Sequence, residues 1–181
     1  GKKGGVSEIY AVSFDGTDVA RLTGYQSLTM LPRWSPDGKR LSFVSYRDGN
    51  PQGYLMDVHR RTTQKIASYP GLNLPSSWSA DGKRMLVTLS KDGSEDIYMM
   101  DVPGGSLKRL TNEPSIEVSP SWSPDGRRFA YQQDRTVRLY DVAGKTSRNL
   151  VSLATLDAAA TPVKPEPVYG WRNRRVQEQS L

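Results

Sequence analysis

Few residues of this chain could carry out chemistry. It has one histidine, His59, and no cysteine, which excludes disulfides, zinc fingers and thiol catalysis and removes most acid–base triads. A serine hydrolase needs a Gly-x-Ser-x-Gly turn with a partner histidine, and the sequence contains no such turn. His59 lies beside Arg60 and Arg61, where an exposed turn residue is the simpler interpretation. The sequence therefore predicts no catalytic residue, no cofactor and no enzyme.

One short segment concentrates carboxylates. Asp92, Glu95 and Asp96 follow one another closely, but they lack the Asp-x-Asp-x-Asp-Gly spacing and the distant glutamate of a calcium loop. We interpret the segment as the charged end of a hairpin, with a weak cation site as the alternative. No metal site is predicted.

The chain is built from a repeat of 44 residues, and the structural units of this repeat must position any binding site. The string Trp-Ser-Pro/Ala-Asp-Gly-Lys/Arg-Arg occurs at Trp34, Trp78 and Trp122, spaced by 44 residues each time. Downstream, Tyr54-Leu-Met-Asp-Val and Tyr98-Met-Met-Asp-Val are also 44 residues apart. A period of about 40 to 45 residues is typical of stacked four-stranded units.

The repeated string contains the chemistry of a tight turn. Proline presets the backbone for a type I turn, and serine and aspartate side chains can accept hydrogen bonds from nearby backbone N–H groups. Glycine tolerates the backbone conformation at the last position of the turn. Alternating segments such as 41–45 follow each turn, as expected for strands. Four antiparallel strands per repeat form a propeller blade, so the fold class is all-β. Since a blade must bury both faces, the tryptophans are expected to pack between blades.

The repeat divides the chain into about three and a half blades within residues 1–156. The expected units are a half-blade at 5–23, blades at 28–67, 72–111 and 116–150, a proline-rich connector at 157–170 and a closing strand or tail at 171–181. Closed propellers usually have four to eight blades. The chain is therefore expected to be part of a larger ring, or to have a ring that is closed by the tail or by a homodimer.

Charge and hydropathy limit the partners further. There are 25 basic and 19 acidic residues, a net charge of +6, but the basic pairs recur along the repeat and only Arg172, Arg174 and Arg175 cluster. This distribution does not favour nucleic acid. No apolar run reaches the roughly 20 residues of a spanning helix, so no membrane insertion is expected, and no secretory signal is expected in the chain as given.

The repeat string, with the Ile-Tyr-Met-Met-Asp-Val segment about 20 residues later, resembles the repeats of TolB-type β-propellers. The resemblance covers residues 5 to about 131. It implies a six-bladed, non-catalytic propeller of the periplasmic Tol–Pal system, which binds the peptidoglycan-associated lipoprotein Pal or a similar protein or peptide. Residues 132–181 are more similar to propellers of prolyl-oligopeptidase-type serine hydrolases. The alternative function is therefore an accessory propeller that gates substrate entry to a catalytic domain outside this chain.

The same period predicts where a protein partner binds. Apolar residues precede each repeated tryptophan in matched register: Leu28, Leu72 and Ile116 six residues before it, and Met30, Leu74 and Val118 four residues before it. In a propeller this segment enters the innermost strand, and the resemblance implies that the partner docks at this mouth of the channel. We expect Met30, Leu74 and Val118 to form an apolar patch with polar neighbours, because interfaces combine apolar anchors with a polar rim. The complete set of expected partner-binding residues is Met30, Leu31, Leu72, Asn73, Leu74, Glu117, Val118 and Ser119.

Overall fold

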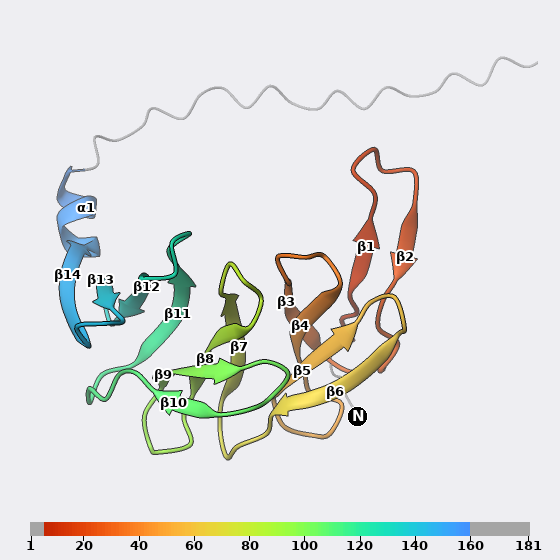
Figure 1. Ribbon diagram of the computed structural model, residues 1–181, viewed down its shortest axis with the longest axis horizontal. Helices are drawn as coiled ribbons and strands as arrows, with labels where there is room; N and C mark the ends of the chain where they lie inside the picture. The colour runs from red at the N-terminus through yellow and green to blue at the C-terminus, as the bar shows by residue number, and fades with distance from the viewer. Residues whose placement is uncertain (1–5, 160–181) are drawn as a thin grey trace, which may run out of the picture.

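The computed structural model describes residues 6–159 as an open arc of β-sheets (Figure 1). Three sheets have four antiparallel strands and one has two. This confirms the expected all-β propeller segment of about three and a half blades. Among residues 6–159 the only helix is α1 (Leu153–Ala159), which follows the last strand, and no helix in that range has the length and apolar character to cross a membrane.

The sheets follow one another in chain order. The half-blade contains β1 (Tyr10–Val12) and β2 (Val19–Arg21). Blade 1 contains β3 (Thr29–Trp34), β4 (Arg40–Ser45), β5 (Gln52–Asp57) and β6 (Thr62–Ala67). Blade 2 contains β7 (Asn73–Trp78), β8 (Arg84–Leu89), β9 (Asp96–Asp101) and β10 (Leu107–Arg109). Blade 3 contains β11 (Glu117–Trp122), β12 (Arg128–Gln133), β13 (Thr136–Asp141) and β14 (Thr146–Ser152).

The repeated turn has the hydrogen bonds that its residue types require. In blade 2, the Ser79 hydroxyl donates to the Asp81 carboxylate at 2.6 Å, which accepts the Lys83 backbone N–H at 3.0 Å. Gly82 lies at a φ of 66°, in the left-handed region that glycine adopts without strain. Blades 1 and 3 repeat the serine–aspartate bond at 2.5 and 2.6 Å. The turn therefore aligns the first two strands of every blade in the same way.

The hydrophobic core lies between successive blades. Between blades 1 and 2, buried side chains such as Leu55, Met85 and Tyr98 pack together. Between blades 2 and 3, Leu86 packs with Phe129 and neighbouring aromatic residues. Between the half-blade and blade 1, Ile9 and Leu22 of the half-blade pack against four buried residues of β4 and β5: Leu41, Phe43, Tyr54 and Met56. Burial between neighbours is expected because one blade cannot cover both of its own faces.

The C-terminal segments are only partly covered by the structure. Residues 157–159, expected to begin an extended connector, are instead the end of α1, whose alanine and leucine content favours helix. Residues 160–170 of the connector and the expected closing strand at 171–181 lie outside the described residues. The connector and the closing strand therefore stay predictions.

Candidate functional site

A shallow groove runs along the innermost strands of all three blades. We call it the inner groove; its volume is about 480 Å³. Its walls come from β3, β7 and β11 and from the turn after β3. The lining residues are Leu31, Arg33, Trp34, Pro36, Leu74, Pro75, Ser76, Ser77, Trp78, Val118, Ser119, Pro120 and Ser121. Apolar and small polar side chains predominate, and Arg33 is the single charged residue among them.

A β-bulge in each innermost strand decides which side chains reach the groove. The pairing register shifts between Met30 and Arg33 in blade 1, with corresponding shifts in blades 2 and 3. Leu31 and Ser119, which are 88 residues apart and occupy the same repeat position, both lie at a φ of 55°. A bulge adds one residue to a strand and redirects the side chains around it. As a result Leu31, 41% exposed, lines the groove.

The structure brings together four of the eight expected partner-binding residues: Leu31, Leu74, Val118 and Ser119 all line the inner groove. Met30 and Leu72 are half-buried and are not among its lining residues. The expectation that Met30 joins Leu74 and Val118 assumed strict alternation along a regular strand. The bulge breaks that alternation, and Leu31 takes the place expected for Met30.

Asn73 and Glu117, expected at the polar rim, are instead buried. Each is the first residue of an innermost strand, directly under the loop that arrives from the preceding blade. The Asn73 side-chain N–H groups donate to the carbonyls of Pro51, Tyr69 and Gly71 at 2.8 to 3.1 Å, and its carbonyl accepts the Tyr69 backbone N–H. A polar side chain is therefore needed at this position, because it provides hydrogen-bond partners for the buried backbone groups of the loop.

Glu117 occupies the same position in blade 3 and has a perturbed acidity. Burial is the main cause that raises the pKa of its carboxyl group to about 7. The nearby Asp96 carboxylate also raises this pKa, whereas a hydrogen bond with Thr111 lowers it. The weak contact from the Gln133 side chain, at 3.4 Å, reaches one carboxyl oxygen, and the other has no hydrogen-bond partner. The group sits inside the boundary of blades 2 and 3 and does not face the groove.

Prolines interrupt the groove-side edge of the innermost strands. Pro32 and Pro120 occupy equivalent repeat positions, and Pro75 lies in the strand between them. Proline has no backbone N–H to offer to an added strand and is typical of protected edges. A ligand in the groove is therefore held by side-chain contacts more readily than by strand addition.

Sequence reasoning missed Trp34 as a groove residue. It predicted all three tryptophans between blades, and Trp78 is 8% exposed as expected, but Trp34 is 49% exposed. The reason is that the described part of the preceding unit, β1 and β2, contains only two strands. The 44-residue repeat alone could have indicated this, because the half-blade lacks the strands against which Trp34 would pack.

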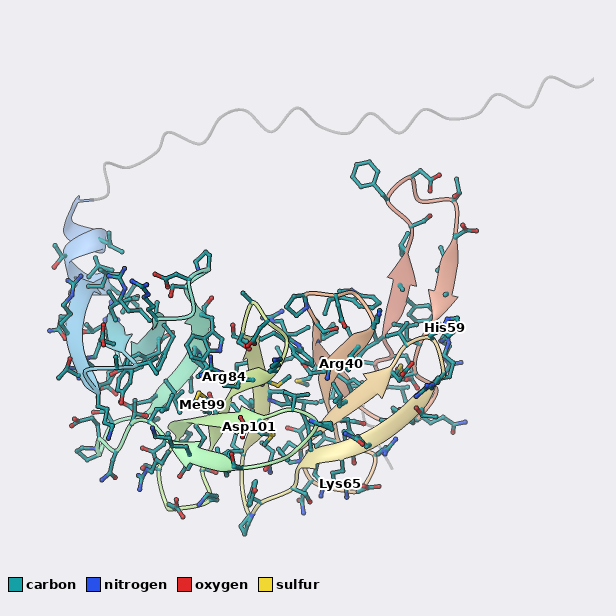
Figure 2. All side chains as sticks on the ribbon, in the orientation of Figure 1. Arg40, His59, Lys65, Arg84, Met99 and Asp101 are labelled. Atoms are coloured by element: carbon teal, nitrogen blue, oxygen red, sulfur yellow. The ribbon has the colours of Figure 1, made fainter. Side chains whose placement is uncertain are left out.

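The remaining chemical candidates are ordinary surface groups or structural pairs. His59 is exposed at the turn after β5 (Figure 2). Asp92 accepts hydrogen bonds from Lys91 and the Tyr98 hydroxyl, and buried Asp96 pairs with Arg109 at 2.6 Å. In the part of the chain covered by the structure, no three His, Asp or Glu residues are placed to hold a metal ion.

Comparison with known proteins places these features in a family. A family model described as the TolB beta propeller domain matches residues 2–157. The Tol-Pal system protein TolB of Syntrophus aciditrophicus is 51% identical over 69 residues, which is 36% of this chain and 15% of that protein. A homologue of TolB from Chlorobium luteolum is 39% identical over 59 residues, 33% of this chain and 14% of that protein.

Solved structures agree with the sequence matches. The crystal structure of TolB from Acinetobacter baumannii superposes with a TM-score of 0.72 and 32% identity, over 78% of this chain and 37% of that one. A structure from work on two prolyl endopeptidases superposes with a TM-score of 0.64 and 14% identity, over 81% of this chain and 26% of that one, a similarity that shows the fold alone. The chain thus spans well under half the length of these relatives.

Proposed function

Because this chain belongs to the TolB beta-propeller domain family, we propose that it is a non-catalytic, protein-binding propeller of the Tol–Pal system, working in the periplasm. Its partner in this proposal is a Pal-like lipoprotein, which inserts a loop or peptide into the inner groove. The names of the relatives support the Tol–Pal assignment. The observation that carries the docking site is the alignment of apolar residues from three blades along one groove, exposed in blade 1 (Leu31) and half-buried in blades 2 and 3 (Leu74 and Val118).

The composition of the groove fits a protein partner better than a small polar substrate. Leu31 and Trp34 are 41% and 49% exposed, and large apolar side chains in a concave surface are typical anchors of protein interfaces. The lining hydroxyl groups of the serines supply polar contacts beside them. No lining residue is a histidine, aspartate or glutamate, which agrees with a binding role.

The charge of the groove adds a selectivity that can be tested. Arg33 is exposed, and its guanidinium donates a hydrogen bond to the neighbouring Pro32 carbonyl at 3.3 Å. A partner segment with an apolar side chain beside a carboxylate would contact the apolar wall and this guanidinium together. Opposite charges across an interface mainly raise the association rate.

The experiment is a calorimetric titration of the full chain with the soluble domain of a Pal-like lipoprotein. The triple variant Leu31→Ser, Leu74→Ser, Val118→Ser should weaken binding by at least about tenfold, or about 1.4 kcal/mol. The matched control is Leu150→Ser, which removes a leucine of similar exposure, 52%, from β14. This control should leave the affinity unchanged.

Two results would count against the proposal. The triple variant could retain full affinity with an unchanged circular dichroism spectrum, in which case the groove is not the docking site. Alternatively, the unmodified chain could fail to bind any Pal-like domain at high micromolar concentration while remaining folded, and the partner assignment would then be wrong.

A further inference from the structure

Two turns of blade 1 enclose a pocket that shares no lining residue with the inner groove. We call it the basic pocket; its volume is about 740 Å³. One wall is the turn between β3 and β4, and the other is the turn between β5 and β6, where Figure 2 marks His59 close to the half-blade. The side chains that line it are Lys39, Asp57, Val58, His59, Arg60 and Arg61. Three of them carry a permanent positive charge, and Asp57 is the single carboxylate among the lining residues.

A backbone hydrogen bond holds the two turns together in every complete blade. In blade 1 the Val58 N–H donates to the Lys39 carbonyl at 3.0 Å. Blades 2 and 3 have the equivalent bonds to the Lys83 and Arg127 carbonyls, at 2.9 and 3.0 Å. The repeat therefore places one basic residue of the first turn beside the second turn in each blade.

Blade 1 differs from the other two blades in the second turn. It has His59-Arg60-Arg61, where blade 2 has Pro103-Gly104-Gly105 and blade 3 has Ala143-Gly144-Lys145. Arg61 lies at a φ of 59°, in the left-handed region that glycine adopts without strain and that a residue with a Cβ atom adopts at a cost. The turn can form without these arginines, as it does in blade 2, so their presence in blade 1 is not explained by the fold.

The charged groups of the basic pocket keep donors available for a ligand. Lys39 and Arg60 are exposed, and within residues 6–159 their side chains form no hydrogen bond or ion pair. Arg61 donates one N–H to the Arg21 carbonyl at 2.8 Å, which orients its guanidinium and leaves the other N–H groups free. The Asp57 carboxylate accepts the Arg60 backbone N–H at 2.8 Å, so it closes the turn and does not pair with a basic side chain.

We propose that the basic pocket binds a phosphate group, carried either by a lipid headgroup or by a soluble compound. A guanidinium group presents two parallel N–H donors to a pair of phosphate oxygens, and an ammonium group adds a point charge. Lys39, Arg60 and Arg61 approach from two turns, so a tetrahedral group with several charged oxygens can contact all three. A carboxylate has only two oxygens to share among them. The proposal does not depend on the partner of the inner groove.

Nuclear magnetic resonance of the full chain can test the pocket with inorganic pyrophosphate as the probe. Saturable shifts should appear at the backbone amides of the two turns, and acetate at the same ionic strength should not produce them. The double variant Arg60→Gly, Arg61→Gly gives this turn the two glycines that blade 2 has, so it should fold. It should bind pyrophosphate at least about tenfold more weakly than the unmodified chain.

A second pair of variants keeps the test valid if the double variant does not fold. Lys39→Ala removes the basic side chain of the first turn and should weaken pyrophosphate binding by about threefold, as expected for one exposed charge. The matched control is Lys83→Ala, the same position in blade 2, where the facing turn has no basic residue. This control should leave the affinity unchanged.

Vesicles distinguish the two sources of the phosphate group. Sedimentation with phosphatidylcholine vesicles that contain phosphatidic acid, lost when the phosphatidic acid or the Arg60 and Arg61 side chains are removed, would assign the site to a lipid headgroup. Pyrophosphate binding without vesicle binding would assign it to a soluble compound. The proposal is overturned if pyrophosphate does not bind, or if Lys39→Ala and Lys83→Ala have equal effects. Binding of polyglutamate but not of pyrophosphate also overturns it, because the pocket would then recognise an acidic protein segment.

Discussion

The guanidinium group of Arg40 in blade 1 lies 5.0 Å from the ring centroid of Trp78 in blade 2, and it also donates a hydrogen bond to the Gly82 carbonyl at 2.9 Å. One side chain thus fixes both the indole and the turn of the neighbouring blade. Because the arginine and the tryptophan recur every 44 residues, the same contact can form at each boundary between complete blades.

Loss of the Arg40 side chain should weaken this boundary. Arg40→Ala removes the cation–π contact and the hydrogen bond to Gly82, and we expect the free energy of unfolding to fall by about 1–2 kcal/mol. Lys39→Ala changes the adjacent exposed residue and should stay within about 0.5 kcal/mol of the unmodified chain. Urea denaturation of both variants measures the difference, and equal midpoints would show that the contact contributes nothing.

Gly53 tests how closely the blades approach each other. A Cβ atom at this position would lie 2.7 Å from the Pro75 ring of blade 2 and 3.0 Å from the Ala67 side chain, so Gly53→Ala should destabilise the fold by about 1–3 kcal/mol through overpacking. Gly24→Ala is the control, because its Cβ would meet only the flexible end of Arg21, at 3.4 Å. Thermal melts of the two variants provide the comparison; a stable Gly53→Ala variant would mean that the blades can separate without cost.

Glu117 should make stability depend on pH near neutrality. Its pKa is about 7 in the folded chain and near the usual 4.5 when unfolded, so the folded state binds more protons between these values. The free energy of unfolding should therefore fall as the pH rises from about 4.5 to 7, and then level off. The charged groups that act on the carboxyl are Asp96, Glu113 and Arg138.

Glu117→Gln isolates this effect, since an amide cannot ionise. At pH 8 the variant should be more stable than the unmodified chain by roughly 1–3 kcal/mol, and at pH 4.5 the two should be nearly equal. Denaturation measured at both pH values tests the prediction. A difference that is the same at both would mean that ionisation of Glu117 is not its cause.

The repeated turns should respond to acid in the opposite direction. The hydrogen bond from Ser79, and then that from the Lys83 backbone, lower the pKa of Asp81. Because the folded pKa is depressed, the stabilisation is present above the unfolded value near 4 and is lost as the pH falls through the folded pKa. Asp81→Asn should therefore reduce the loss of stability below about pH 4. An unchanged acid-unfolding curve for this variant would contradict the role given to the turn.

The sequence predicted the blades well because turn chemistry and alternation act locally. The serine, aspartate and glycine of each turn determine where the first two strands begin and end, so the spacing of Trp34, Trp78 and Trp122 translated directly into equivalent strand positions. The half-blade followed from the same period.

The candidate site was only partly predictable, because side-chain exposure there depends on backbone conformation and on neighbouring segments that the repeat pattern does not specify. The bulge that turns Leu31 into the groove depends on a left-handed backbone at a residue other than glycine, and no residue type signals it. The burial of Asn73 and Glu117 arises from the loop of the preceding blade that lies over them. The exposure of Trp34 depends on which strands the neighbouring unit contains.

The most direct test of the proposed function is a hydrogen-exchange footprint of the full chain with and without a saturating Pal-like lipoprotein domain. If the partner docks in the inner groove, exchange should slow in the three groove segments, 31–34, 74–78 and 118–121, and should not change in β13 and β14 on the outer side of blade 3. Protection confined to the outer strands, or no protection at saturation, would contradict the inner groove as the docking site.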